Sequence, residues 1–184
     1  MTTRRNFLAG SAAVLVAAVG ASSVLGMRVA VASEGPLATA TNFGHDLITL
    51  PVEPVEKTEA EWRALLSPEQ FAVLREEATE RPFTSDLLKI KTKGTYACAG
   101  CALPLYRSEV KFDSRTGWPS FSEGIEGALD TKNDYGLFVP RTEVHCIRCG
   151  GHQGHIFEDG PKPTGNRHCI NGIALTFVAD DATG

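Results

Sequence analysis

The chain has no cysteine before Cys98 and no acidic residue before Glu34. The first absence excludes a lipoprotein-type anchor near the N-terminus, because such an anchor needs a cysteine to carry the lipid. Positive charge is also scarce, with 18 lysines and arginines against 22 aspartates and glutamates and a net charge of −4. That balance argues against nucleic acid or an anionic membrane as a partner. The sequence shows no internal repeat.

The N-terminal segment has the composition of an export signal. Arg4-Arg5 precedes a weakly hydrophobic run over residues 9–25, and residues 3–8 resemble the core of a twin-arginine signal. Small residues just before position 33 suit cleavage by a signal peptidase after Ala32. An ordinary secretory signal and an uncleaved anchor are the alternatives. The run is rich in Ala, Gly and Ser, which would make it a poor permanent anchor in a bilayer.

This interpretation divides the chain into a signal peptide at 1–32, a linker or extended arm at 33–57, and a folded domain at 58–180. Cleavage after Ala32 would leave 152 residues, which suits one domain with a sizeable core. The removed part carries three arginines and no acid, so 15 basic residues remain against 22 acidic ones, a net charge of −7. We expect a periplasmic or otherwise exported protein that meets the twin-arginine translocase during export. It would bind no nucleic acid and keep no stable membrane anchor.

Four of the five cysteines form two C-x-x-C pairs, Cys98/Cys101 and Cys146/Cys149. Each C-x-x-C turn directs two thiolates at one point, so two turns complete a closed, tetrahedral and therefore structural zinc site. Disulfides and a redox-active C-x-x-C are the competing interpretations. The twin-arginine route carries proteins already folded, so a zinc ion loaded in the reducing cytoplasm would survive export. We predict one structural Zn²⁺ ion, and the 44 residues between the pairs mean that it joins distant strands.

Two helix starts follow the predicted arm. The segment beginning at Thr58 fits a capping box and continues with apolar residues at helical spacing. Ser67 caps a second helix, with Pro68 at its first position and Gln70 at its third. We expect this second helix to end at Pro82, because proline cannot continue a helix. Both helices would cover one side of the domain and carry no chemistry.

Beyond the second helix the sequence changes to short β-type runs separated by Gly, Pro, Asn and Asp. Strands are predicted over residues 95–98, 103–112, 127–131, 136–147, 154–157 and 169–178. Residues 133–136 look like a hairpin turn. In the last run Cys169 and Asn171 would share a face if the strand stays regular, and a bulge at Gly172 would break the alternation. The predicted fold class is mainly β with a minor α+β character: antiparallel sheets with two short N-terminal helices.

Cys169 is the only cysteine without a partner at metal-ligand spacing, which makes it the candidate reactive thiol. Arg167, two residues before it, would favour the thiolate, and Asn171, two residues after it, would donate a hydrogen bond. Three further polar and aromatic segments lie in glycine-rich surroundings, at 116–121, 151–157 and 159–165. Taken singly, each has an ordinary explanation, such as a tryptophan in the core, histidines that satisfy hydrogen bonds, or Gly-Pro turns.

Together with Cys169, these segments resemble the methionine-R-sulfoxide reductases of the B type over residues 66–178. The matching residues follow the family's order and are 117–121, 141–149, 154–157, 159–161, 163–165 and 167–171. The two C-x-x-C pairs also stand where the zinc-binding members carry theirs. The resemblance implies an MsrB-type catalytic domain at 58–180 with the zinc-stapled, Mss4-like fold.

The resemblance also implies the activity, which is reduction of the R epimer of methionine sulfoxide in proteins and peptides to methionine. Cys169 matches the family's nucleophile, which would attack the electrophilic sulfur and become a sulfenic acid. His155, with help from His152 and Asn171, would bind or protonate the oxygen, since histidine can hold and release a proton near neutral pH.

Three more residues receive roles from the resemblance. Trp118 and Phe157 would contact the substrate, with Trp118 as the apolar wall that seats the methyl group. Arg167 would stabilise the thiolate or the developing anion. The substrates would be oxidised proteins or peptides, so the enzyme would repair exported proteins under oxidative stress.

The sequence departs from the family at Thr116, where many members carry a second cysteine that attacks the sulfenic acid. The remaining four cysteines are assigned to zinc, so we expect an external reductant, either a thioredoxin-like protein or a small thiol. His168 is a second departure, because an aromatic residue is often found beside the family's nucleophile. It would either add positive potential at the thiol or face solvent.

Two other functional classes compete with the enzyme. A zinc-stapled β-domain that only binds a protein or small ligand would lack the lone cysteine and its histidine, asparagine and tryptophan surroundings. A Cys-His hydrolase or peroxidase would need a Cys, His and carboxylate set in a recognisable order, which this chain does not present. We therefore favour the reductase.

Overall fold

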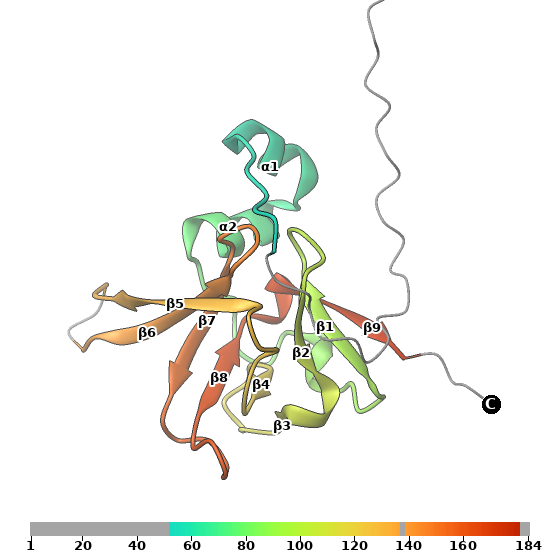
Figure 1. Cartoon of the computed structure of the whole chain (residues 1–184), viewed down its shortest axis with the longest axis vertical. Helices are drawn as coiled ribbons and strands as arrows, with labels where there is room; N and C mark the ends of the chain where they lie inside the picture. Colours follow the sequence, from blue (N-terminus) through green and yellow to red (C-terminus); the bar gives the residue numbers. More distant parts are fainter. Residues whose placement is uncertain (1–51, 137–138, 181–184) are drawn as a thin grey trace, which may run out of the picture. The chain divides into compact units, whose positions relative to one another are not determined.

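The computed structural model describes residues 52–136 and 139–180 (Figure 1). The predicted signal peptide at 1–32 lies outside the described residues, as does most of the predicted arm. Within the described ranges, no helix is both long enough and apolar enough to cross a bilayer. The Val55 N–H group donates to the Arg148 carbonyl at 2.7 Å, which ties the start of the described chain to the turn that follows Cys146.

Helices α1 (Glu59–Leu65) and α2 (Pro68–Glu76) begin where the sequence predicts them. The Thr58 hydroxyl accepts a hydrogen bond from the Glu61 N–H group, and the Glu61 carboxylate accepts one from the Thr58 N–H group at 2.7 Å. Ser67 begins α2 with a second capping box of the same kind. Each box satisfies backbone donors that the first turn leaves free and stabilises its helix by about 1 kcal/mol.

The predicted end of the second helix was wrong. Helix α2 stops at Glu76 rather than at Pro82, because Glu77 adopts the left-handed conformation with φ 56°. The Ala78 N–H group then donates to the Ala72 carbonyl at 3.0 Å, a C-terminal cap that satisfies a carbonyl of the last turn. The early end leaves the following residues to cross the domain as irregular chain.

A three-stranded antiparallel sheet has β1 (Gly94–Cys98) at its centre, between β2 (Pro104–Arg107) and β9 (Leu175–Ala179) (Figure 1). The predicted strand at 103–112 is divided, because a 3-10 turn, η2 (Ser108–Val110), follows β2. The rest of that run belongs to the other sheet.

A six-stranded antiparallel sheet has the order β3 (Lys111–Phe112), β4 (Ser120–Phe121), β8 (Arg167–Ile170), β7 (His152–Phe157), β6 (Arg141–Cys146) and β5 (Leu129–Asp134). Strand β4 was missed, since two residues are too few to show an alternating pattern. The predicted turn at 133–136 begins too early, because Asn133 and Asp134 still pair with β6. The fold class is confirmed: the described chain is mostly antiparallel β-sheet with two short helices.

The predicted strand at 169–178 is interrupted by a 3-10 turn, η3 (Gly172–Ala174), so β8 and β9 lie in different sheets. The interruption falls at Gly172, where the sequence allowed for a bulge. The condition under which Cys169 and Asn171 would share a strand face, a strand that stays regular through both, is not met, because β8 ends at Ile170 and Asn171 begins this turn.

The two sheets meet around a buried aromatic cluster. The Phe121 ring of the six-stranded sheet stacks on Tyr106 with ring centroids 4.2 Å apart and meets the edge of Tyr96 at 5.0 Å. Each such pair contributes about 0.5–1.5 kcal/mol beyond the area that it buries. This packing holds β4, and therefore its neighbour β8, in a fixed place.

Candidate active site and metal centre

A row of residues crosses the six-stranded sheet from β5 to β4. Lys132 lies opposite Glu143, Glu143 opposite His155, His155 opposite Cys169, and Cys169 opposite Ser120. Residues directly opposite one another in antiparallel strands have Cβ atoms about 4.5–5.5 Å apart on the same face. The register therefore places the candidate thiol between a histidine and a hydroxyl, with a carboxylate one strand further on.

The thiol of Cys169 is half-buried, and burial raises its pKa. The positive charge of Arg167 and hydrogen bonds with Thr116 and Arg167 lower the pKa of this thiol, but burial outweighs them. Arg167 thus acts in the predicted direction, while the thiol as a whole is held protonated at neutral pH.

Arg167 is clamped in place on β8. Its Nε and Nη2 atoms donate to the two carboxylate oxygens of Asp159 at 2.8 and 3.0 Å. Its guanidinium carbon lies 4.5 Å from the centre of the Phe157 ring, which stands opposite it in the register of β7. The hydrogen bonds with Asp159 raise the pKa of Arg167, so the group stays a cation beside the thiol.

His155 is held by an acidic partner from β5. Its Nε2 atom lies 2.8 Å from Oδ2 of Asp134, which also accepts a hydrogen bond from Arg141 Nη2 at 2.6 Å. The Gly136 N–H group, followed by these two partners, keeps the pKa of Asp134 well below its usual range. A carboxylate can only accept, so a neutral His155 donates from Nε2 and keeps a lone pair on Nδ1. Burial lowers the pKa of His155, and the Asp134 hydrogen bond opposes that shift.

His152 is buried beside His155, with ring centroids 5.4 Å apart. Its Nδ1 atom lies 2.7 Å from Oε1 of the buried Glu143, and burial lowers the pKa of His152 to about 4. The Nζ atom of Lys132 lies 2.9 Å from Oε2 of Glu143 and forms a second ion pair with Oε1 of Glu77 at 2.5 Å. The remaining His152 nitrogen, Nε2, has no hydrogen-bond partner among the described residues.

Trp118 and Asn171 are joined through Glu80, on the irregular chain after α2. The Trp118 indole N–H group donates to the Glu80 carbonyl at 3.2 Å, and the Glu80 N–H group donates to Oδ1 of Asn171 at 3.0 Å. The Asn171 amide nitrogen donates to the Gln153 carbonyl at 3.1 Å. Both ends of the Asn171 side chain are thus hydrogen-bonded to backbone groups, so that this side chain joins the segment at Glu80 to strand β7.

A chain of hydroxyl groups leads away from the thiol on the side opposite to the histidines. The Ser114 hydroxyl is 2.8 Å from that of Thr116 and 2.7 Å from that of Ser120. Ser120 in turn donates to the Trp118 carbonyl at 3.1 Å. Thr116, which stands where the resemblance leads us to expect a second cysteine, belongs to this hydrogen-bonded chain and lies close enough to the thiol to lower its pKa.

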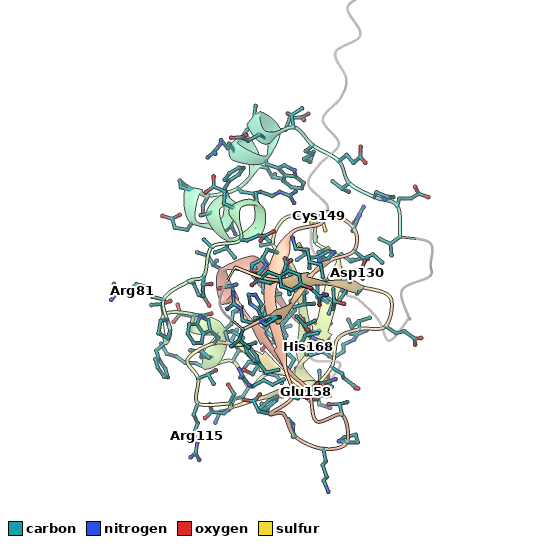
Figure 2. All side chains as sticks on the ribbon, turned by 90° about the vertical axis from the view of Figure 1, so that its left-hand side faces the viewer. Arg81, Arg115, Asp130, Cys149, Glu158 and His168 are labelled. Carbon is teal, nitrogen blue, oxygen red and sulfur yellow. The ribbon has the colours of Figure 1, made fainter. Side chains whose placement is uncertain are left out.

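Neither expectation for His168 fits the structure. The side chain is buried inside the domain, where its Nδ1 atom is 3.3 Å from the Tyr106 hydroxyl (Figure 2). Burial lowers the pKa of His168 to about 4, so it is neutral at physiological pH. It neither faces solvent nor adds positive charge at the thiol.

Sequence reasoning missed three acidic residues that hold the site, two through their carboxylates and Glu80 through its backbone. Glu143 stands within the 141–149 stretch that carries the resemblance, so a charged residue in a half-apolar strand was an available signal. Asp134 was assigned to a turn, and Glu80 follows a helix without any distinguishing pattern. Their positions depend on which strands and loops meet in space.

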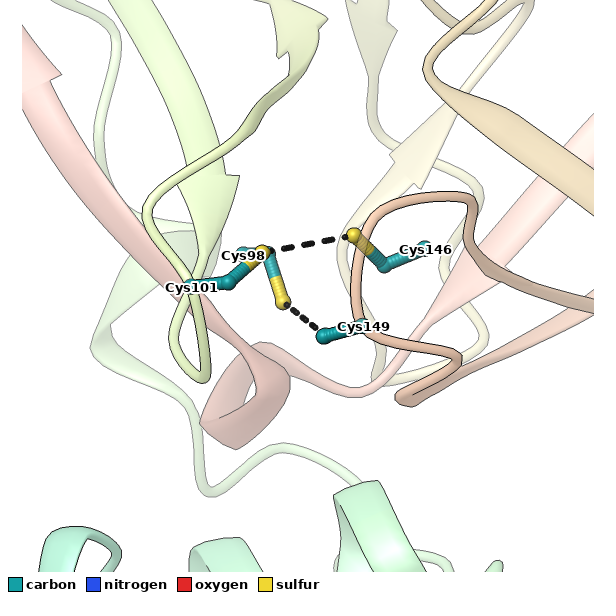
Figure 3. Close-up of side chains that lie close together, drawn as sticks. All are labelled: Cys98, Cys101, Cys146 and Cys149. Atoms are coloured by element: carbon teal, nitrogen blue, oxygen red, sulfur yellow. Dashed lines mark hydrogen bonds between the residues drawn. The ribbon is translucent and has the colours of Figure 1, made fainter. Parts of the chain in front are cut away.

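The other four cysteines form a compact cluster, and all four sulfurs lie within 4.8 Å of one another. The Cys98 and Cys149 sulfurs are 3.7 Å apart, and those of Cys101 and Cys146 are 3.5 Å apart, so neither pair is a disulfide. Figure 3 shows the two C-x-x-C turns facing one another with these pairs between them. Cys169 lies outside the cluster.

The cluster can hold one metal ion. Four thiolates around a tetrahedral zinc at about 2.3 Å place the sulfurs about 3.8 Å apart, close to the distances found here. Cys98 ends β1 and Cys146 ends β6, so a bound ion would connect the three-stranded sheet to the six-stranded one. Gly150 turns the chain after the second pair with φ 65°, a conformation that glycine adopts without strain.

Comparison with known proteins agrees with this geometry. Residues 66–179 match the SelR domain family. Three proteins named peptide methionine sulfoxide reductase MsrB are similar to the chain. The protein of Methanosarcina mazei is 49% identical over 131 residues, which cover 71% of this chain and 94% of the relative. That of Methanosarcina barkeri is 51% identical over 128 residues, covering 69% and 90%. That of Agrobacterium fabrum is 49% identical over 124 residues, covering 67% and 92%. The chain therefore belongs to the SelR domain family of MsrB-type peptide methionine sulfoxide reductases.

Proposed function

We propose that this oxidoreductase reduces the R epimer of methionine sulfoxide in proteins and peptides to methionine, with Cys169 as its nucleophile. The observation that carries the proposal is that Cys169 on β8 lies opposite His155 on the neighbouring strand β7. Beside His155 stands the Nε2 atom of His152, which has no hydrogen-bond partner in the part of the chain that the structure describes. A sulfoxide needs a nucleophile for its sulfur, a proton for its oxygen and a partner for the resulting hydroxyl. These three side chains supply all of them.

The proton for the oxygen comes from the thiol itself. Because burial keeps Cys169 protonated and both histidines neutral, the free site already holds the one proton that the reaction needs. As the thiol sulfur attacks, its proton passes by way of the His155 lone pair to the sulfoxide oxygen. The attack joins the two sulfurs. The hydroxyl group then moves from the substrate sulfur to the Cys169 sulfur, so that the substrate's sulfur–oxygen bond and the sulfur–sulfur bond both break. The substrate sulfur is reduced by two electrons, Cys169 is oxidised by two, and the products are methionine and a sulfenic acid.

Trp118 forms the apolar wall for the substrate's methyl group, and its half-buried ring is fixed by the hydrogen bond to Glu80. A rigid wall on one side of the sulfur and the histidines on the other leave room for one arrangement of methyl and oxygen. This arrangement is the basis that we propose for selecting one epimer. Phe157 supports the guanidinium of Arg167, which stabilises negative charge on the Cys169 sulfur.

The sulfenic acid is reduced by an external thiol. Thr116 occupies the place of a resolving cysteine, and the other four cysteines form the metal cluster. One thiol of the reductant displaces water from the sulfenic acid to give a mixed disulfide, and a second thiol then releases Cys169 and leaves as a disulfide. A thioredoxin-like protein or a small thiol would supply both.

The metal that we propose for the four-cysteine cluster is zinc. Cys98, Cys101, Cys146 and Cys149 would hold it, and a closed four-thiolate site leaves no position for substrate. Its contribution is structural: it fixes the ends of β1 and β6 relative to each other. No step of the reaction passes through it.

We also propose that the chain is exported through the twin-arginine translocase, cut near Ala32 and released to the periplasm or another exported compartment. The support is the Arg4-Arg5 pair with the run that follows it, together with the small residues before the cleavage site. The substrates would then be oxidised exported proteins. N-terminal mass determination on the secreted protein tests this, and an intact residue 1–32 segment in the mature protein contradicts it.

Turnover of the separate R and S sulfoxides of a blocked methionine, with dithiothreitol as reductant, tests the activity. We expect the R epimer alone to be reduced and Cys169→Ser to abolish the reaction. His155→Asn should lower kcat by about 10²–10⁴-fold, the usual contribution of a positioned acid–base group. Equal turnover of both epimers, or activity that survives Cys169→Ser, would refute the assignment.

A further inference from the structure

Trp118 also lines a pocket of about 500 Å³, a size suited to a small ligand or a side chain. Its lining combines aromatic rings with cations: Phe83, Phe112, Trp118, Lys89, Lys91 and Lys111. Of these lining residues, only Trp118 has a part in the proposed reaction.

The pocket carries an excess of positive charge, although the chain as a whole has a net charge of −4. Three lysines line it against one carboxylate, that of Asp113. Lys89 also pairs with Asp86 at 3.1 Å, but both side chains are highly exposed, and such pairs are weak. Among the described residues, no acidic group forms an ion pair with Lys91 or Lys111.

The ammonium group of Lys111 is half-buried and donates to the carbonyls of Leu88 and Ile90 at 3.3 and 3.1 Å. Burial lowers the pKa of Lys111, Asp113 opposes this shift, and the nearby charge of Lys91 lowers the pKa further. Two like charges therefore repel each other across the pocket. A negatively charged guest would relieve that repulsion.

The pocket is one short step from the thiol. Thr116 lies close enough to Cys169 to lower the pKa of its thiol, while Gly117 and Trp118, the next residues along the chain, line the pocket. Neighbouring Cα atoms are about 3.8 Å apart, and an extended peptide advances about 3.3 Å per residue. A substrate side chain one to three residues from a sulfoxide seated at Trp118 therefore reaches the pocket.

Phe83 forms an exposed rim of this pocket. Its side chain is 70% exposed, although its backbone has a φ of 63°, which residues with a side chain rarely adopt. The Phe83 N–H group donates to the Gly117 carbonyl at 2.7 Å, which holds this conformation. A Cβ on Gly117 would lie 2.9 Å from the Phe83 ring, so glycine is required there. A strained, outward-facing aromatic beside a candidate site indicates a contact surface for a ligand.

We propose that this pocket binds an acidic side chain of the substrate polypeptide, one to three residues from the methionine sulfoxide. The inference rests on the proposed function and deepens it by naming the substrate class. The Lys91 and Lys111 ammonium groups pair with the carboxylate, and Phe83 packs against the peptide beside it.

Two sets of blocked peptides test the proposal. Every peptide has a central methionine R-sulfoxide and one charged residue, placed one, two or three positions before or after it. The charged residue is glutamate in one set and lysine in the other. The wild-type protein should show a kcat/KM about three- to tenfold higher for at least one glutamate peptide than for its lysine counterpart, and high salt should weaken that preference. Lys91→Glu should abolish or invert the preference. Lys93→Glu, an exposed charge change two residues away and outside the lining, should preserve it.

The proposal is overturned if the wild-type protein has the same kcat/KM for the glutamate and lysine peptides of every pair. It is also overturned if Lys91→Glu and Lys93→Glu change the peptide preference equally, or if Lys91→Glu changes only the KM for a protein reductant. Blocked methionine sulfoxide, which has no flanking residues, should be reduced equally well by all three proteins. If none of the three proteins reduces blocked methionine sulfoxide, the proposed function is refuted instead. Equilibrium binding of the same peptides to Cys169→Ser protein, with and without Lys91→Glu, measures the preference without turnover.

Discussion

His155 on β7 lies directly opposite Cys169 on β8, and its Nε2 atom is 2.8 Å from the carboxylate of Asp134 on β5. Asp134→Asn removes the negative charge that raises the pKa of His155. We expect kcat/KM to fall by about 10–100-fold. The acid limb of its pH profile should move to lower pH, because a histidine with a lower pKa becomes neutral at a lower pH. The exposed Asp130→Asn, on the same strand, is the matched control. Equal kcat/KM values for the two variants would remove Asp134 from the site.

Thr116→Val should make the Cys169 thiol less reactive toward iodoacetamide. The Thr116 hydrogen bond lowers the pKa of the thiol, so its loss raises that pKa and reduces the thiolate fraction at any pH below it. We expect alkylation near pH 8 to slow by less than about tenfold, and Thr116→Ser to restore the rate because it keeps the hydroxyl. Faster alkylation of the valine variant would show that the hydroxyl does not stabilise the thiolate.

The oxidised protein should carry its modification on Cys169 alone. After one equivalent of methionine sulfoxide, without reductant, intact-mass measurement and peptide mapping should find a sulfenic acid or a mixed adduct with added thiol. The four clustered cysteines should remain free of it, since their sulfurs pair with one another. An internal disulfide from Cys169 to any of them would contradict reduction by an external thiol.

Metal removal should unfold the protein rather than alter its chemistry directly. Elemental analysis should find one zinc per chain, and Cys98→Ser should lose it together with more than about 3 kcal/mol of the free energy of unfolding, because metal binding is coupled to folding. Cys169→Ser should retain zinc and lie within about 1 kcal/mol of the wild-type protein. A Cys98→Ser protein with unchanged unfolding free energy would speak against a structural metal.

The buried His168 should make stability depend on pH. Its folded-state pKa of about 4 lies below the ordinary value of 6.5, so the unfolded chain binds the proton more readily. Its contribution is fully present above pH 6.5 and is lost as the pH falls toward 4. His168→Phe should reduce the loss of unfolding free energy between pH 7 and pH 4.5 by about 2 kcal/mol. Denaturant titrations of both proteins at both pH values measure this difference, and identical losses would mean that His168 is not titrating as described.

The local features of the chain were readable from the sequence because they depend on neighbours along it. Ser67 begins its helix through contacts with the next few residues, and each C-x-x-C turn is formed within four. The lone position of Cys169 follows from counting. The end of α2 was predicted at Pro82, where a helix must stop, but the chain turned earlier, at Glu77, so that the residues after it reach Asn171.

The sequence by itself determined the antiparallel β class, the two capped helices, the two C-x-x-C turns and the isolated thiol. Only the tertiary structure decided that Glu143, His155, Cys169 and Ser120 stand opposite one another, because strand register is set by packing between distant segments. It also decided the protonation of the site. Nearby charge alone suggests a thiolate at Cys169, whereas burial, which exists only once the sheets have packed, keeps the proton on the sulfur.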